Sequence, residues 1–204
     1  MKGVRGQAAG DPPGSGIDDA AARSMIRDGT GIVCNWWRNR KTITLPQIRD
    51  KLTAANLDRH IHDYAVFGPE TPFISLSAGC VERSVALRLN RIHQASDVAL
   101  RFATDWGSTH GYLFQCWVVV GLKPAVGVDV VAEEVRDLNS YMNYSDYQLE
   151  GEITAKVSIP SGQILQCQRW DCDNKGRVKR LPTWTYRNRR FEAPAQVSNI
   201  LGFI

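Results

Sequence analysis

The spacing of apolar residues predicts helices in the first half of the chain and strands in the second half. Residues 17–27 and 45–67 have apolar side chains at helical intervals, and Asp18 and Pro46 stand where such helices begin. Residues 81–106 have a helical composition as well. Runs of β-branched and aromatic residues predict strands at 31–39, 73–77, 111–122, 152–159 and 162–171. Helices followed by clustered strands indicate an α+β fold.

The chain has 204 residues, a length that suits one domain with a sizeable core. Residues 1–16 are rich in Gly, Pro and Ala, so we expect a flexible tail followed by one folded domain over 17–204. The tripeptide Pro-Ser-Gly at 160–162 is a turn signal and predicts that the two strands beside it form a hairpin.

Several classes of protein are disfavoured by composition. No apolar run approaches the roughly 20 residues that a membrane-spanning helix needs, and the first residues lack the apolar segment of a secretory signal. Five cysteines in irregular spacing favour a reducing compartment, and no nearby histidine completes a zinc set around Cys167 and Cys172. We therefore expect a cytoplasmic protein with no metal and no membrane contact.

The net charge of +4 is concentrated in residues 175–190, which are dense in Lys and Arg and contain no acid. Trp184 and Tyr186 interleave with these cations. Cations with aromatic rings suit phosphate neutralisation together with base stacking, as in proteins that bind single-stranded nucleic acid. A solvated basic loop is the competing interpretation, and the composition alone does not separate the two.

Two carboxylates, Glu150 and Glu152, are separated only by Gly151 at the start of a predicted strand. Alternate residues of a strand point to the same face, so these like charges would lie side by side. The pair is either solvated or part of a site that needs two acids. His60 and His62 stand two apart in a predicted helix and point in different directions, so we expect both on the surface.

Three segments together resemble the mono-ADP-ribosyltransferase toxins of the cholera-toxin type. FISLSAG (73–79) resembles their serine strand, GYLFQCWVVVGLKPAVGVDVV (111–131) their middle strand, and LEGEITAKVSIPSGQIL (149–165) their Glu-x-Glu strand. Leu76 stands where the family often has Thr. The resemblance implies an ADP-ribosyltransferase-like catalytic domain with two small antiparallel or mixed sheets packed around an NAD cleft, and with N-terminal helices.

The resemblance also implies a reaction in which NAD is a substrate, cleaved between nicotinamide and ribose, and ADP-ribose passes to a nucleophile. Such a reaction develops positive charge on the ribose, as in glycoside hydrolysis, and a fixed carboxylate stabilises that charge. By this resemblance Glu152 binds the ribose 2′-hydroxyl, Glu150 orients or deprotonates the acceptor, and Ser75 holds Glu152. Phe73 and Ser77 would lie on the NAD side.

In the family an Arg on the opening strand binds the NAD phosphates. Aligning GIVCNWWRNR (31–40) with that strand puts Cys34 near the expected position, with Arg38 on the same strand face. We expect Arg38 to contact phosphate, because a planar guanidinium binds phosphate through two hydrogen bonds.

The acceptor is the most open part of the prediction. Glu-x-Glu accompanies arginine modification in this family, whereas Gln-x-Glu, also readable at Gln148 to Glu150, accompanies other acceptors including nucleotide bases. The basic aromatic segment makes us favour single-stranded RNA or DNA over protein arginine. An NAD glycohydrolase and a non-enzymatic nucleic-acid-binding module remain alternatives. The residues that we expect to bind the acceptor are Tyr144, Tyr147, Trp184, Tyr186 and Arg187.

A toxin-like enzyme in the cytoplasm of a producing or target cell must be held in check or delivered separately. The resemblance therefore implies a neutralising antitoxin or immunity protein as a partner, as in toxin–antitoxin or phage-defence systems.

Overall fold

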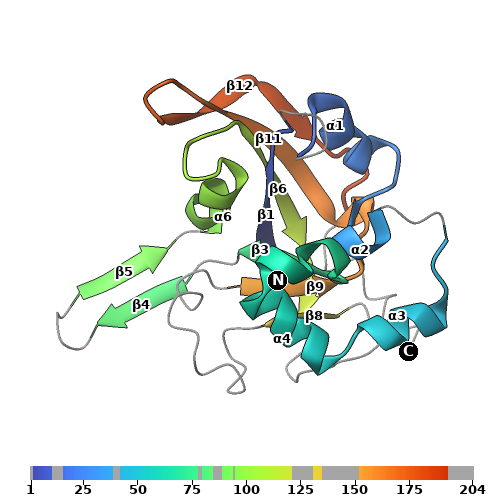
Figure 1. Ribbon diagram of the computed structural model, residues 1–204. Coiled ribbons are helices and arrows are strands. Elements are labelled where there is room, and N and C mark those ends of the chain that lie inside the picture. The colour runs from blue at the N-terminus through green and yellow to red at the C-terminus, as the bar shows by residue number, and fades with distance from the viewer. Residues whose placement is uncertain are drawn as a thin grey trace.

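The computed structural model describes residues 2–10, 16–38, 42–77, 80–84, 89–93, 95–120, 131–134 and 152–192. It contains one large, mostly antiparallel sheet flanked by short helices (Figure 1). The α+β fold class predicted from the sequence is therefore confirmed.

The large sheet has eight strands in the order β12-β11-β6-β1-β3-β9-β8-β7. These strands are β1 (Lys2–Ala8), β3 (Phe73–Ser77), β6 (Gly111–Trp117), β7 (Val119–Val120), β8 (Val131–Glu134), β9 (Glu152–Lys156), β11 (Ile164–Cys172) and β12 (Val178–Arg187). Two further pairs are formed by β2 (Ile32–Val33) with β10 (Ser158–Ile159) and by β4 (Cys80–Ser84) with β5 (Leu89–His93).

The α-helices of the described residues are all short. They are α1 (Asp19–Arg27), α2 (Asn35–Arg38), α3 (Leu45–Lys51), α4 (Ala54–His62), α5 (Tyr64–Phe67) and α6 (Ala95–Ala103). The helix predicted at 45–67 is divided into three because polar caps interrupt it. Thr44 begins α3 with a capping box, and the Thr53 hydroxyl accepts the Asn56 N–H to begin α4.

The N-terminal segment is the largest departure from the sequence prediction. Residues 1–16 were expected to form a flexible tail, and this is wrong for β1, which lies near the middle of the sheet. β1 pairs with β6 over its full length, from Lys2↔Trp117 to Ala8↔Gly111. Gly6 allows β1 to pack closely against α6, because a Cβ at this position would overlap the Ala99 carbonyl oxygen.

Among the residues that the structure describes, β1 and β3 pair at Val4↔Ser77, and no pairing follows between residues 5–8 and the rest of β3. On its other side β3 pairs over five residues with β9, from Phe73↔Lys156 to Ser77↔Glu152. The sheet thus consists of two well-paired halves that separate beyond Val4. An opening between β1 and β3 follows from this separation.

Three further sequence expectations were wrong. Residues 35–38 form helix α2 rather than the end of a strand. The first part of the helix predicted at 81–106 is occupied by β4 and β5. The strands on either side of Pro160 do not pair with each other, because β9 joins β3 whereas β11 lies between β6 and β12.

The two faces of the sheet carry different hydrophobic clusters. The main core lies on the α1 side and includes Ile26, Trp36, Phe114 and Ile153. A smaller core under α6 joins Val4, Ala99, Ala103 and Leu113. In Figure 1 α1 and α6 lie on opposite sides of β6 and β11. No helix within the described ranges is long and apolar enough to span a membrane.

We expect Gly6→Ala to lower the free energy of unfolding by about 1–3 kcal/mol, because the new methyl group displaces α6 from β1. Gly162→Ala is the matched control, since the nearest atom to its added Cβ is the Arg190 carbonyl oxygen at 3.9 Å. Urea denaturation followed by circular dichroism measures both changes. Equal stabilities of the two variants would contradict the proposed close contact.

Candidate active site

A cavity of about 480 Å³ lies at the opening between the two halves of the sheet. Its walls come from β1, α4, β3, α6 and the first residue of β9. Arg5, His60, Ser75, Ser77 and Glu152 all line it. Polar and ionisable side chains that meet in one cavity are typical of an active site.

Glu152 is 7% exposed, so its carboxylate needs partners. The Thr154 hydroxyl donates to its Oε1 at 3.2 Å, and His60 Nε2 lies 3.7 Å from the same oxygen. Burial alone raises the pKa of Glu152, but His60 and the hydroxyls of Ser75 and Thr154 outweigh burial and hold the pKa below its ordinary value. Glu152 is therefore an anion at neutral pH.

A chain of hydrogen bonds holds His60 in place beneath the cavity. The Thr71 hydroxyl accepts the Phe73 N–H at 3.2 Å and lies 2.8 Å from His60 Nδ1. His60 Nε2 lies 2.9 Å from the Ser75 hydroxyl. A hydroxyl has one proton to donate, and Nδ1 is positioned to accept it. In that tautomer the Nε2–H points to Ser75 and Glu152, and Thr71 orients the ring.

His60 was expected on the surface, and this is wrong: it is 3% exposed. It lies in α4 between the buried residues Leu57 and Ile61, which are three residues before it and one after it. That spacing places His60 on the apolar face of the helix. The sequence prediction considered only the spacing of His60 and His62 and therefore missed this signal.

Arg5 lies on β1, the first strand of the chain, and its side chain lines the cavity. Its Nη1 donates to the Ser75 carbonyl oxygen at 3.0 Å, next to His60 and Glu152. Arg5 Nε and Gln7 Oε1 are both buried and have no hydrogen-bond partner among the described residues. Unsatisfied polar atoms at a cavity wall suit a polar ligand, because such atoms are costly to bury alone. Sequence reasoning missed Arg5 because it treated the segment as a tail.

Arg38, predicted as the phosphate contact, lies close to Arg5 but on helix α2 rather than on the opening strand. Partial burial and the charge of Arg5 lower the pKa of Arg38. Neither arginine has an ion-pair partner in the described part of the chain. Two neighbouring cations that form no ion pair attract an anionic group such as a diphosphate.

The other residues predicted for NAD binding have mixed positions. Ser77 lines the cavity and is the direct register partner of Glu152. Ser75 is the partner of Thr154, so these side chains leave the sheet on one face. Cys34 and Phe73 are buried, and Cys34 lies in the main core.

The predicted acceptor residues that the structure describes do not line this cavity. Glu150, Tyr144 and Tyr147 lie outside the described residues. Trp184 was expected to contact the acceptor, but it is 6% exposed and packs on Tyr112, so its ring belongs to the core. Tyr186 and Arg187 line a different cavity at the edge of the sheet.

The described residues contain no group of three or more His, Cys, Asp or Glu side chains that could hold a metal ion. The ionisable centre of this cavity is instead one carboxylate, one imidazole and one guanidinium. A ligand with an anionic part and a part that develops positive charge would be complementary to that set.

The lowered pKa of Glu152 predicts a pH dependence of stability. The folded protein binds this proton more weakly than the unfolded chain, whose Glu has the ordinary value of 4.5. The stabilisation is therefore present above pH 4.5 and is lost as the pH falls through the lower folded value. We expect the free energy of unfolding of the wild type, minus that of Glu152→Gln, to decrease as the pH falls below 4.5. Urea denaturation from pH 7 to pH 3 measures it, and a constant difference would contradict the assignment.

Comparisons with known proteins connect this geometry with a fold. No protein-family model and no curated protein matches the sequence. Among solved structures, EcPltA is similar over 94% of this chain and 87% of its own, with a TM-score of 0.53 and 13% identity.

The chain also resembles two mutants of heat-labile enterotoxin, covering 96% of this chain each. The first is an Arg-to-Lys mutant whose A subunit has a flexible active-site loop; the TM-score is 0.45, the identity is 15%, and 79% of that chain is covered. The other, from E. coli, has a TM-score of 0.44, 16% identity and 80% coverage. EcPltA and the enterotoxin A subunits are ADP-ribosyltransferase toxins. On the likeness to EcPltA, this chain has the α+β fold of the ADP-ribosyltransferase toxins.

Proposed function

We propose that the protein is a mono-ADP-ribosyltransferase that cleaves NAD and transfers ADP-ribose to a macromolecular acceptor. The observation that supports this most strongly is the buried anionic Glu152, held by Ser75, Thr154 and His60 at a cavity that also contains Arg5. The fold supports the same activity. The roles of the individual residues follow from their chemistry.

The residues around the cavity fit NAD as a substrate. Arg5 and Arg38 supply two guanidiniums that form no ion pair within the described residues, which suits the diphosphate. The free atoms Arg5 Nε and Gln7 Oε1 offer a donor and an acceptor to the polar groups of the ligand. The volume of about 480 Å³ is within the usual range of small-molecule sites.

NAD supplies a glycosidic bond whose cleavage leaves positive charge on the ribose. Glu152 provides a fixed negative charge for that group and accepts a hydrogen bond from its 2′-hydroxyl. The carboxylate is already ionised and already oriented by Thr154 and His60, so little reorganisation is needed during the reaction. This preorganisation is the main contribution that we assign to the chain.

His60 and Thr71 act one step away from the reacting atoms. The Nε2–H of His60 holds the Ser75 hydroxyl, and Ser75 lies on the same sheet face as Glu152. We assign to Thr71 the role of donating to His60 Nδ1, which leaves the proton of the neutral ring on Nε2. Thr71 is thus a positioning residue. Glu150, two residues before Glu152, is proposed to remove a proton from the acceptor.

A contrast between the two glutamates tests the proposed roles. We expect Glu152→Gln to reduce NAD cleavage by about 100-fold to 1000-fold, because the charge opposite the ribose is lost. Glu150→Gln is expected to keep NAD cleavage but to lose transfer. The measurement uses NAD labelled in the ADP-ribose moiety, incubated with RNA, single-stranded DNA or lysate protein, followed by separation of free and macromolecular label.

The same assay separates the alternatives. Label in nucleic acid supports a base as acceptor, label only in protein indicates arginine, and free ADP-ribose alone indicates an NAD glycohydrolase. A wild-type protein that consumes no NAD contradicts the enzyme proposal. Equal, mild effects of both substitutions mean that the glutamates are wrongly assigned.

The Thr71 assignment has its own test. Thr71→Val keeps the shape but removes the hydroxyl, and we expect NAD cleavage to fall by about tenfold to a hundredfold, as for hydrogen-bond partners that orient metal-binding histidines. Thr71→Ser retains the hydroxyl and is expected to restore most of the rate. The pH profile of kcat is the discriminating measurement, because a misplaced His60 proton shifts the profile. Loss of the same size in both variants, with an unchanged profile, contradicts the positioning role.

A further inference from the structure

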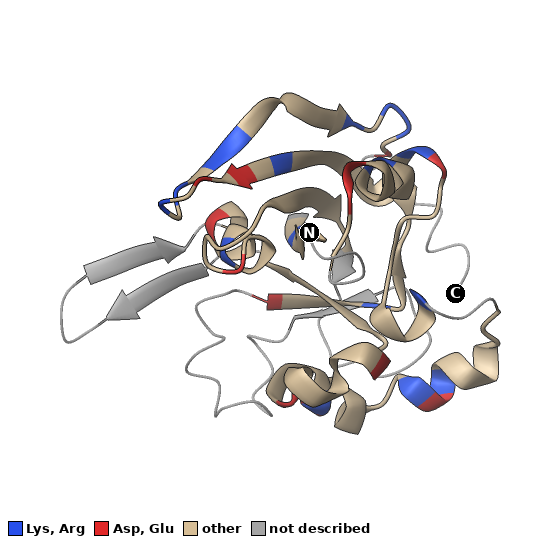
Figure 2. Ribbon diagram, turned by 45° about the horizontal axis from the view of Figure 1, so that its top comes forward, with Lys and Arg blue, Asp and Glu red and all other residues tan. Residues whose placement is uncertain are grey.

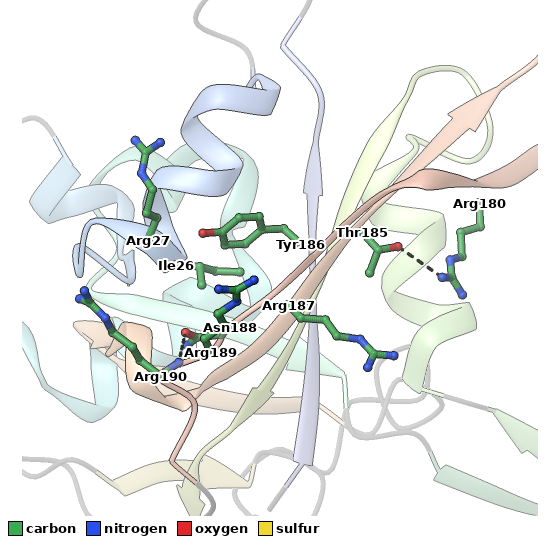
Figure 3. Close-up of a pocket in the computed structure, with 9 residues that line it drawn as sticks. All are labelled: Ile26, Arg27, Arg180, Thr185, Tyr186, Arg187, Asn188, Arg189 and Arg190. Atoms are coloured by element: carbon green, nitrogen blue, oxygen red, sulfur yellow. Dashed lines mark hydrogen bonds between the residues drawn. The ribbon is translucent and has the colours of Figure 1, made fainter.

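A second cavity, of about 850 Å³, lies around the end of β12 and beside the C-terminus of α1. Five arginines line it, and no acidic side chain does: Arg27, Arg180, Arg187, Arg189 and Arg190. We call these five residues the arginine surface. Figure 3 shows their side chains around the strand, and Figure 2 shows Lys and Arg recurring along β12 and the segment after it.

Most of this positive charge is not neutralised. Arg27 pairs with Asp28, at 2.6 and 2.9 Å, and Arg180 donates to the Thr185 hydroxyl at 3.3 Å. The guanidiniums of Arg187, Arg189 and Arg190 form no ion pair with any residue that the structure describes. Like charges held close together without acids favour binding of a polyanion.

The segment after β12 is held firmly in place. The Asn188 side chain donates to the carbonyl oxygens of Ser161 and Ile164 at 2.7 and 2.8 Å. The backbone adds a bond from Asn188 N to the Leu165 carbonyl and one from Glu192 N to the Gly162 carbonyl, both at 2.9 Å. The arginines on both sides of Asn188 therefore have a fixed backbone, which reduces the entropic cost of binding.

Basic residues on an edge strand also protect the edge from pairing with another sheet, and Lys179, Arg180 and Pro182 are explained in that way. Protection of the edge does not explain why the segment after β12 is held by hydrogen bonds, nor why an aromatic ring lies in the cavity. Tyr186 is half-buried and lies toward Ile26 and Arg27 (Figure 3). An aromatic ring among guanidiniums suits stacking of an unpaired base.

The register of the sheet relates one residue of this surface, Arg187, to the candidate active site. Tyr186, the residue before it, leaves the strand on the opposite face, toward Ile26 (Figure 3). Successive strand partners form one row across six strands: Arg187, Gln166, Gln115, Val4, Ser77 and Glu152. Residues opposite each other in such a row leave the sheet on the same face. Arg187 and Glu152 are thus on one face, separated by five strand spacings, or about 24 Å.

We propose that the arginine surface binds the phosphodiester backbone of single-stranded nucleic acid. Binding itself does not depend on the enzymatic proposal. The further step, in which the bound strand presents an acceptor base near Glu152, rests on the enzymatic proposal. In that step the bond from ribose C1′ to nicotinamide breaks with its electron pair on nicotinamide, the exocyclic nitrogen of the base bonds to C1′, and the proton of that nitrogen passes to Glu150.

Binding without NAD is the test. We propose fluorescence anisotropy of labelled 20-nucleotide RNA and DNA single strands, and of the duplex, over a series of salt concentrations. The triple variant Arg187→Gln, Arg189→Gln, Arg190→Gln is expected to bind single strands about ten to a hundred times more weakly. Its plot of log K against log salt should be shallower by about 2, since each lost phosphate contact on a single strand changes the slope by about 0.7.

The matched control removes the same charge outside the basic segment: Arg49→Gln, Arg59→Gln and Arg101→Gln, all exposed in the wild type. It should bind like the wild type, and replacing the three arginines by lysines should preserve the salt slope. Equal losses in both glutamine variants, or equal affinity for duplex and single strand, would overturn the proposal. A protein that cleaves NAD but binds no oligonucleotide refutes this inference alone, and one that binds but cleaves no NAD refutes only the enzymatic proposal.

Discussion

The residue pair Val4↔Ser77, where β1 meets β3 within the described part of the chain, is the constraint on which the rest of the architecture depends. On one side of it β1 is fully paired with β6, and on the other side β3 is fully paired with β9. Each half is therefore well paired by itself, and the two halves separate on the side of Val4 that leads to residues 5–8. The candidate site lies at this separation, where the Arg5 side chain of one half reaches the Ser75 carbonyl oxygen of the other. A fully paired β1 and β3 would leave no room for a ligand.

Burial of Glu152 imposes a second constraint, because an isolated carboxylate in a closed cavity would be protonated instead of charged. Thr154, Ser75 and His60 supply the hydrogen bonds that keep it ionised, and Thr71 fixes His60 in turn. These residues come from α4, β3, β9 and the turn before β3, so the charge state of one atom depends on the packing of several elements. A site of this kind is specified by the tertiary structure as much as by its motif.

The sequence allowed prediction of the parts of the site that lie within one continuous segment. Glu152, Ser75 and Ser77 were found because strand alternation and local motifs are properties of neighbouring residues. Arg5 was missed because β1 is defined by pairing with β6, far along the chain, and because Gly3 and Gly6 lower its intrinsic strand propensity. The expected hairpin at Pro160 failed for a similar reason, since the turn signal is local but the choice of strand partner is not. Trp184 was assigned to the acceptor from composition, which cannot distinguish the two faces of β12.

The long-range pairing of β1 with β6 also has a kinetic consequence. Contacts between residues distant in sequence are slow to form, because the loop between them must first be closed. Arg5 reaches Ser75 only after this loop has closed, and His60 and Glu152 meet through separate long-range contacts. A chain with only its local helices and turns formed has the same residues but no assembled cavity. The candidate site is therefore expected to assemble only when these long-range contacts have formed.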